Sequence, residues 1–228
     1  MFTMGTKLLN KNIFFLLLLL SIFSSCATVE IVPFPDENII RVAAVGDSIT
    51  YGKYIDDRAK NAYPALLEDK LGLLWDVRNF GVSGATLLKS GNKPYWKMAQ
   101  LTDAYNYQPE LVIIKLGTND SKGVNWFYKD QFIADYIEFI TSFQNLLSRP
   151  KVFICYPVPA YADRLGIRDA IIREEILPLI DLVAEKTGVH IIDLYTALSD
   201  KKEMFPDSIH PDAEGAKLIA EIIYQEIR

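Results

Sequence analysis

The sequence predicts an α/β fold, a three-layer α/β/α sandwich in which helices cover both faces of a five-stranded parallel sheet. Short apolar, β-rich segments alternate along the chain with longer segments whose apolar residues recur at helical spacing. The β-rich segments lack a polar alternation, which indicates strands that are buried on both faces, as in parallel sheets covered by helices. The length agrees, because 228 residues, 50% of them hydrophobic, suffice for one sizeable core but hardly for two domains.

The expected elements alternate strand and helix. Strands are predicted at residues 40–45, 75–80, 111–116, 152–156 and 189–194. The clearest helix carries its apolar residues on one face: Phe132, Ile133, Tyr136, Ile137, Ile140, Phe143 and Leu147. A second helix is predicted at residues 168–186 with a kink at Pro178, and a final helix opens at Pro211 with Asp212 and Glu214 in its first turn.

The first residues do not belong to this domain. Lys7 and Lys11 precede an apolar run that is shorter than the roughly 20 residues a membrane-spanning helix needs, and Ser24 and Ser25 then lead to Cys26. This pattern resembles the signal of exported lipoproteins, in which such a cysteine is lipidated. We therefore expect residues 1–25 to be a lipoprotein signal peptide and Cys26 to be the lipidation site. An ordinary secretory peptide cut near Ala27 and a plain membrane anchor remain as alternatives.

Residues 26–38 are expected to form an extended tether that ends where the folded domain, residues 39–228, begins. Pro33 and Pro35 disfavour regular structure there, and no apolar period is sustained. The expected location is outside the inner membrane, on the bacterial cell envelope, with the lipid as the only membrane contact. Nothing in the sequence indicates an oligomeric state.

The charge and cysteine content exclude several kinds of protein. Two lysines and no acidic residue precede Cys26, so the formal net charge of −5 for the whole chain becomes −7 for the mature one. With no basic patch, a nucleic-acid partner is not expected. Beyond Cys26 only Cys155 remains, within an apolar strand, so neither a disulfide nor a cysteine-rich metal site is expected.

Polar, glycine-containing clusters follow the first three predicted strands. They are Gly46-Asp47-Ser48, Gly81-Val82-Ser83-Gly84 and Gly117-Thr118-Asn119-Asp120, and a fourth cluster, Asp207-Ser208-Ile209-His210-Pro211, precedes the last helix. Because the carboxyl ends of parallel strands meet at one edge of the sheet, these clusters are expected to meet there.

The order of the four clusters resembles the four sequence blocks of SGNH (GDSL) hydrolases. The blocks here are Gly-Asp-Ser-Ile-Thr-Tyr-Gly, Gly81, Gly-Thr-Asn-Asp and Asp-Ser-Ile-His-Pro, and they span the predicted domain from end to end. One block alone is a weak signal, whereas four in the correct order at strand ends are specific. The resemblance implies a flavodoxin-like three-layer fold and a serine carboxylic ester hydrolase.

Ser48, His210 and Asp207 are the expected catalytic triad. A serine hydroxyl needs a base that removes its proton during attack, and the chain has two histidines. His190 lies inside a strand-like segment, whereas His210 lies in a loop three residues after Asp207, a spacing at which a turn aims the carboxylate at the imidazole. Ser83 is a rival nucleophile without a histidine or acid nearby in sequence, and we interpret it as a polar turn residue.

By the resemblance, the oxyanion hole consists of the backbone N–H groups of Ser48 and Gly81 and the side-chain amide of Asn119. Asp47 and Asp120, which adjoin the motif residues, are expected to brace the loops through hydrogen bonds to backbone amides. No cofactor is expected.

Other catalytic motifs do not fit the spacing. Ser48 lacks the second glycine of the Gly-x-Ser-x-Gly nucleophile elbow. Gly46 to Gly52-Lys53 has one residue too many for a phosphate-binding loop, and Tyr54 stands where a magnesium-binding hydroxyl would be needed. Two histidines without helical ligand spacing also make a zinc site unexpected, so no metal is predicted.

The substrate prediction is a small-molecule or glycan ester with a short acyl group, most simply an O-acetyl group on a carbohydrate. Aromatic residues crowd the segments after the motifs, and Tyr51 and Trp126 are the possible substrate contacts. The stretch 117–126 also resembles that of bacterial carbohydrate esterases. The alternatives are a lysophospholipase or short-chain lipase and, from another class, a glycan-binding module without activity.

Overall fold

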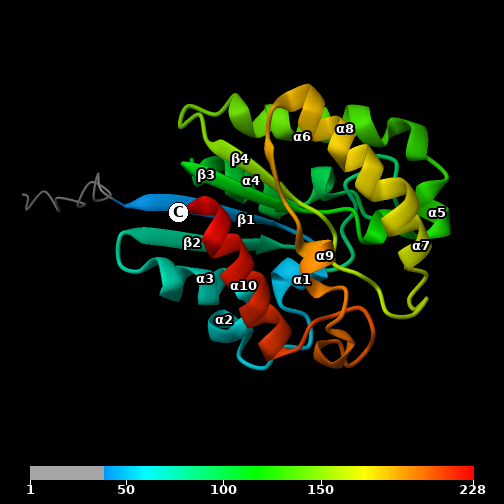
Figure 1. Cartoon of the computed structure of the whole chain (residues 1–228). Coiled ribbons are helices and arrows are strands. Elements are labelled where there is room, and N and C mark those ends of the chain that lie inside the picture. Colours follow the sequence, from blue (N-terminus) through cyan, green and yellow to red (C-terminus); the bar gives the residue numbers. More distant parts are fainter. Residues whose placement is uncertain (1–38) are drawn as a thin grey trace, which may run out of the picture. The chain divides into compact units, whose positions relative to one another are not determined.

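The computed structural model describes residues 39–228, which form a parallel five-stranded sheet between layers of helices (Figure 1). The strands are β1 (Ile40–Gly46), β2 (Trp75–Gly81), β3 (Leu111–Lys115), β4 (Lys151–Cys155) and β5 (His190–Ile192). Their order in the sheet is β2-β1-β3-β4-β5. Each strand starts and ends within two residues of its predicted segment, and the predicted fold class is confirmed.

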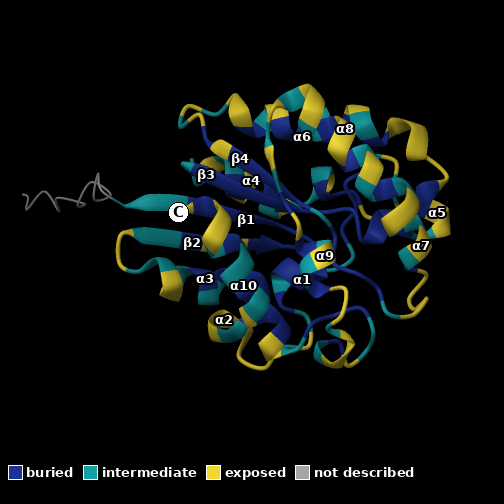
Figure 2. Cartoon of the chain, viewed as in Figure 1, coloured by how far each residue is buried: buried dark blue, intermediate teal, exposed yellow. Residues whose placement is uncertain are grey.

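Two layers of helices bury the two faces of the sheet. Neighbouring residues of β1 point to opposite sides, so that Val42 packs in one apolar cluster and Ala43 in the other. The long helices are α3 (Tyr63–Leu71), α4 (Ala99–Asn106), α6 (Phe132–Gln144), α8 (Leu177–Thr187) and α10 (Ala213–Ile227). Helices α3 and α10 cover one face, and α4, α6 and α8 the other (Figure 1). The strands are mostly buried between them, while the outer faces of the helices are exposed (Figure 2).

Short elements build most of the connections. They are α1 (Ser48–Tyr51), α2 (Arg58–Asn61), α5 (Gly123–Trp126), α7 (Asp169–Ile171) and α9 (Leu194–Leu198), with the 3-10 turns η1 (Tyr95–Lys97), η2 (Asn119–Ser121), η3 (Lys129–Gln131) and η5 (Lys202–Met204). Two of them, α1 and η2, follow β1 and β3 directly and carry motif residues.

The second predicted helix is interrupted by a π-helical turn. Its first part, α7, is followed by η4 (Ile172–Ile176), and α8 begins only at Leu177. Pro178 has no N–H and cannot donate the α-helical hydrogen bond to the carbonyl four residues earlier. A wider, π-helical turn therefore precedes it, where the sequence predicted a kink.

Two other helix predictions need correction. Leu147 is 95% exposed, because α6 ends at Gln144 and the apolar period has no helix to follow beyond it. The final helix begins at Ala213 and not at Pro211. Asp212 is its N-cap, with a carboxylate that accepts a hydrogen bond from the N–H of Gly215 at 2.9 Å.

The predicted signal peptide (1–25), the lipidation site Cys26 and the tether (26–38) lie outside the described residues. In the part of the chain that the structure describes, no helix is long and apolar enough to cross a membrane.

Candidate active site

The motif clusters meet at the carboxyl edge of the sheet. Gly46 at the end of β1 pairs with Gly81 of β2 on one side and with Lys115 of β3 on the other. The loops that follow these three strands are therefore neighbours, although about 35 residues separate consecutive clusters. The segment that precedes α10 reaches the same edge, where it contacts Ser48.

Ser48 is the first residue of α1, immediately after β1. Asp47 is the N-cap of this helix, and its Oδ1 accepts a hydrogen bond from the N–H of Ile49 at 2.9 Å. The N–H of Ser48 donates to no other atom of residues 39–228, as expected for the first turn of a helix. The strand-to-helix turn thus holds a hydroxyl and a free amide donor at one position.

Ser48, His210 and Asp207 form one hydrogen-bonded line. The Nε2 atom of His210 lies 2.9 Å from Ser48 Oγ, and its Nδ1 atom lies 2.7 Å from Asp207 Oδ2. A carboxylate can only accept at Nδ1, so the imidazole carries its proton there and leaves Nε2 free to accept from the serine hydroxyl. The structure therefore brings together the three residues that the sequence predicted as a triad.

A tight turn fixes the Asp207 carboxylate. Its Oδ1 accepts from the backbone N–H groups of Ile209 and His210 at 2.9 and 2.7 Å, and Ser208 between them has a positive φ of 70°. Burial opposes ionisation of Asp207, but the hydrogen bonds from the His210 ring and the two amides outweigh it and lower the pKa of this carboxyl. The carboxylate is thus charged at neutral pH and able to stabilise an imidazolium.

Asn119 directs its side-chain amide at the loop that follows β2. Asn119 is only 3% exposed. Its Nδ2 donates one hydrogen bond to the carbonyl of Ala85 at 3.1 Å, so the second N–H of the amide remains for another acceptor. The buried Asn125 holds this turn in place, because its own amide donates to the Asn119 carbonyl at 2.8 Å. Asn119 is therefore positioned by neighbours on both sides.

Asp120 fastens the Asn119 turn to the loop after β2, as the sequence predicted. Its two carboxylate oxygens accept from the backbone N–H groups of Leu87 and Leu88 at 3.0 and 2.8 Å. Burial raises the pKa of Asp120 to about 6, although both amides favour the charged form.

A buried ion pair behind the nucleophile was not predicted. The ammonium of Lys115, at the end of β3, lies 3.1 Å from Asp47 Oδ2 and donates to Thr118 Oγ1 at 2.8 Å, and both charged side chains are fully buried. Lys115 thus connects the N-cap of α1 to the turn that carries Asn119. The sequence signal was a lysine that ends an apolar strand just before Gly117.

Gly81 has a packing role that the sequence did not predict. A Cβ atom there would lie 2.2 Å from the backbone nitrogen of Tyr51, so only glycine lets β2 approach α1 this closely. Its N–H donates to the side chain of Asn79 at 2.9 Å. By contrast, the N–H of Gly84, three residues further, donates to no atom of residues 39–228, and Gly84 adjoins Ala85, the acceptor for the Asn119 amide. Gly84 has a positive φ of 81°.

The aromatic residue beside the triad is Tyr54. Its ring meets the His210 ring edge-on, with 5.3 Å between centroids, and it is 71% exposed with a positive φ of 67°. A cavity of about 360 Å³ opens here, lined by Tyr54, Pro206, Asp207, His210, Pro211 and Asp212. Tyr54 is not one of the two predicted substrate contacts, because no sequence pattern distinguishes it from the other aromatic residues near the motifs.

The two predicted substrate contacts, Tyr51 and Trp126, both pack against other side chains of the protein. Tyr51 is the last residue of α1, and the Arg58 guanidinium stacks over its ring at 3.9 Å from the centroid. Trp126 is only 5% exposed, packs against Phe132, and donates its indole N–H to Glu175 at 2.9 Å. Little of the Trp126 surface is left for a substrate.

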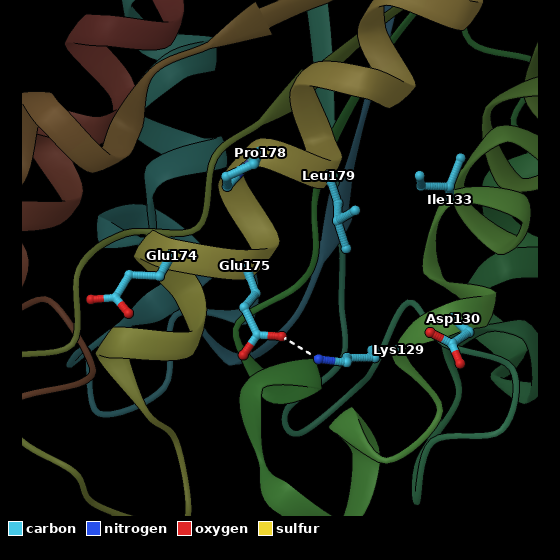
Figure 3. Close-up of a pocket in the computed structure, with 7 residues that line it drawn as sticks. All are labelled: Lys129, Asp130, Ile133, Glu174, Glu175, Pro178 and Leu179. Atoms are coloured by element: carbon cyan, nitrogen blue, oxygen red, sulfur yellow. Dashed lines mark hydrogen bonds and ion pairs between the residues drawn. The ribbon is translucent and has the colours of Figure 1, made fainter.

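A separate cavity of about 480 Å³ lies between η3 and α6 on one side and η4 and α8 on the other (Figure 3). It is lined by Lys129, Asp130, Ile133, Glu174, Glu175, Pro178 and Leu179. The ammonium of Lys129 lies 2.7 Å from Glu175 Oε2, the same oxygen that accepts from Trp126. No triad residue lines this cavity, so it is distinct from the serine site. Among residues 39–228, His, Cys, Asp and Glu side chains form no group of three that could hold a metal ion.

A parallel α/β sheet with a hydrogen-bonded serine, histidine and aspartate at its carboxyl edge defines the class of α/β serine hydrolases. Residues 44–218 match the GDSL-like Lipase/Acylhydrolase family, and the chain belongs to that family. The resemblance found in the sequence motifs is thereby confirmed.

One curated relative and two solved structures extend this comparison. An acetylxylan esterase of Xylanibacter ruminicola is 40% identical over 215 aligned residues, which cover 86% of this chain and 45% of the relative. The chain thus spans about half the length of that protein. The structure of the acetyl xylan esterase AlAXEase has a TM-score of 0.66 at 20% identity and covers 83% of this chain and 100% of its own. The aryl esterase of M. smegmatis has a TM-score of 0.66 at 18% identity, with 83% and 98% covered.

Proposed function

We propose that this protein is a serine esterase that hydrolyses short-chain acyl esters, in the first place O-acetyl groups, of carbohydrates. The observation that carries the proposal is the line of hydrogen bonds from Ser48 Oγ through His210 to Asp207. The relative that is 40% identical supports the carbohydrate ester, since it is described as an acetylxylan esterase.

The triad assigns one role to each residue. Ser48 Oγ attacks the ester carbonyl while its proton passes to His210 Nε2, and Asp207 stabilises the imidazolium that forms. The tetrahedral intermediate collapses to acetyl-Ser48, and the imidazolium returns the proton to the sugar oxygen that leaves. A water molecule then attacks the acetyl-enzyme, with Nε2 again taking the proton, and acetate and free Ser48 result.

The oxyanion of the tetrahedral intermediate needs donors that are in place beforehand. Two are the free N–H of Ser48 and the second N–H of the Asn119 amide. We assign the third donor to the N–H of Gly84, since the N–H of Gly81, the residue expected from the sequence, already donates to Asn79. Such donors are typically worth about 3 to 4 kcal/mol each in the transition state.

The surface around the triad favours a sugar ester over a long acyl chain. Tyr54 offers an exposed aromatic face beside His210, the type of surface on which sugar rings pack. Among the residues that line the adjoining cavity, the polar or charged ones are Tyr54, Asp207, His210 and Asp212, and the apolar ones are two prolines. A lysophospholipase would want a long apolar groove at this place.

The test measures acetate released from acetylated xylo-oligosaccharides, alongside hydrolysis of p-nitrophenyl acetate and octanoate, with Ser48→Ala as the inactive control. We expect release of acetate from the sugar and faster turnover of the acetyl than of the octanoyl ester. Faster octanoyl turnover without acetate release would favour the lipase alternative. Binding of the oligosaccharide without any ester hydrolysis would favour a glycan-binding module.

We further propose that the protein acts at the bacterial cell envelope, held there by lipid on Cys26. The proposal rests on the apolar run that ends in Ser24-Ser25-Cys26. Cys26→Ala expressed in a bacterial host is expected to leave the membrane fraction and appear as soluble protein. Retention of the variant in membranes, or an unmodified mature N-terminus at another position, would contradict the anchor.

A further inference from the structure

Each of the loops that follow β1, β2, β3 and β4 at the carboxyl edge of the sheet carries a basic side chain. We call these the rim cations: Lys53, Lys93, Lys122 and Arg164. Together they surround a site in a chain whose formal net charge is −5. Their positions follow from contacts with four different catalytic segments.

Lys53 lies in the loop that follows β1 and α1, and Lys93 lies in the loop that follows β2. The backbone N–H of Lys53 donates to the Ser48 carbonyl at 2.9 Å, and its ammonium lies 4.8 Å from the centre of the Tyr54 ring, which itself packs on His210. The ammonium of Lys93 donates to the carbonyl of Ser83 at 2.8 Å, and its side chain passes along Gly84. The Lys53 charge therefore lies at Tyr54, beside His210, and the Lys93 charge lies at Ser83, next to the proposed oxyanion donor Gly84.

Lys122 and Arg164 belong to the loops that follow β3 and β4. Lys122 directly follows the Asn119 turn, and its aliphatic stem lies against Gly166. The Arg164 guanidinium donates to the carbonyl of Asp207 at 3.3 Å. Burial lowers the pKa of the Lys122 ammonium, and repulsion from Lys53 adds to this shift while Asp47 and Asp120 oppose it.

None of the rim cations forms an ion pair with a carboxylate of residues 39–228. The carboxylates of the site are engaged elsewhere. Asp47 pairs with Lys115, Asp207 with His210, and Asp120 and Asp212 accept from backbone amides. The four rim cations thus keep their charge without an ion-pair partner, although Asp207 and Asp212, which line the cavity beside the triad, are negative.

We propose that the rim cations bind a carboxylate of the substrate, so that the preferred glycan carries a uronic acid near the acetylated sugar. This inference rests on the proposed function and adds the charge of the substrate to it. The cations lie on separate loops and share no acceptor, an arrangement that suits an anion carried on a chain which passes the serine. An uncharged acetyl-sugar would offer these four cations no counter-charge.

The test compares two substrates that differ only in charge. One is an acetylated xylo-oligosaccharide that carries a uronic acid, and the other is the same molecule with the carboxylate reduced to a hydroxymethyl group. We expect a higher kcat/KM for the acidic substrate, and we expect the preference to shrink as salt screens the charges. Equal kcat/KM values at low salt would overturn the proposal.

Single variants identify the side chains responsible. Lys53→Gln, Lys122→Gln and Arg164→Gln are each expected to lower the ratio of acidic to reduced kcat/KM by about two- to fivefold, the range of exposed charge pairs. Lys186→Gln is the matched control, because Lys186 is exposed in the last turn of α8, next to the start of β5 at the opposite edge of the sheet. A ratio that stays constant in all rim variants would contradict the proposal, even if both activities fell.

Binding separates this inference from the proposed function. With Ser48→Ala, which keeps all four rim cations, calorimetry is expected to show tighter binding of the acidic oligosaccharide than of the reduced one. If wild type released acetate from neither substrate, the proposed esterase function would fail, while a binding preference that Lys122→Gln reduces would still support the charge recognition. Equal binding of both sugars would overturn it.

Discussion

The chain contains two histidine–carboxylate pairs that have the same N···O distance but different surroundings. His210 and Asp207 are 2.7 Å apart at the carboxyl edge of the sheet, and His190 and Glu226 are 2.7 Å apart at the start of β5. The His210 side chain is 4% exposed and that of Asp207 25%, whereas His190 and Glu226 are 53% and 42% exposed.

The difference lies in what else the imidazole contacts. In His210, Nδ1 is hydrogen-bonded to the carboxylate and Nε2 to Ser48. In His190, Nε2 is hydrogen-bonded to Glu226, and the ring packs against Phe153. Only the first arrangement connects a nucleophile, a base and an acid in one line. A short histidine–carboxylate distance is therefore no sign of catalysis by itself, and burial with a third partner is the informative feature.

The largest effect is expected on esterase activity when the His210–Asp207 pair is changed. His210→Gln removes the base that accepts the serine proton, and we expect it to lower kcat for acetyl esters by roughly 10⁴-fold or more. His190→Gln, which changes the same residue type at the exposed pair, is expected to retain wild-type kcat. Kinetics with p-nitrophenyl acetate decide it, and the comparison breaks down if the two variants exchange these results.

The next largest effect concerns stability at the catalytic edge. Lys115→Met leaves the fully buried Asp47 carboxylate without its cation, and we expect a loss of about 3 to 5 kcal/mol in the free energy of unfolding. Denaturant unfolding measures it. The double variant Asp47→Asn/Lys115→Met removes the stranded charge and should recover part of the loss. A single variant as stable as wild type would show that the buried pair contributes nothing.

Asp120 gives the stability of the catalytic edge a pH dependence. Its folded pKa of about 6 exceeds the ordinary value of 3.8, so the folded chain keeps a proton that the unfolded chain releases between these values. This stability is fully present below pH 3.8 and is lost as pH rises through about 6. Across this window wild type should lose up to about 3 kcal/mol relative to Asp120→Asn. Unfolding curves that stay parallel from pH 4 to 7 would rule this out.

The smallest effect is expected at the exposed pair. Glu226→Gln removes a carboxylate that solvent already screens, so the free energy of unfolding should change by less than about 1 kcal/mol. Thermal unfolding in low and high salt checks this. A loss comparable with that of Lys115→Met would mean that exposure is a poor guide to the strength of these pairs.

The sequence predicted the strands well because most are short runs rich in β-branched and apolar residues. The strand β2 is an exception, since Asp76, Arg78 and Asn79 interrupt its apolar residues and Arg78 and Asn79 are exposed. The triad could also be predicted, since its residues stand in motif loops at strand ends and only two histidines compete for the role of base. The helix ends were harder. Leu147 fits the apolar period of α6, but the helix stops at Gln144, and a period alone does not mark where a helix ends.

Contacts between loops that are distant in sequence escaped prediction. The Lys115–Asp47 pair joins residues 68 positions apart, and the position of Tyr54 on His210 depends on a backbone with positive φ. Whether Gly81 or Gly84 is the proposed oxyanion donor depends on the Asn79 side chain, which accepts the hydrogen bond of the Gly81 N–H. Such features follow from three-dimensional packing, and no local pattern of residue types encodes them.

Labelling with a serine-directed phosphonate tests the central claim most directly, namely that Ser48, activated by His210, is the nucleophile. Mass spectrometry of the labelled wild-type protein should find one modified residue, Ser48, with the same labelling rate in His190→Gln and a much lower rate in His210→Gln. A label on Ser83, or equal labelling rates in the two histidine variants, would contradict it.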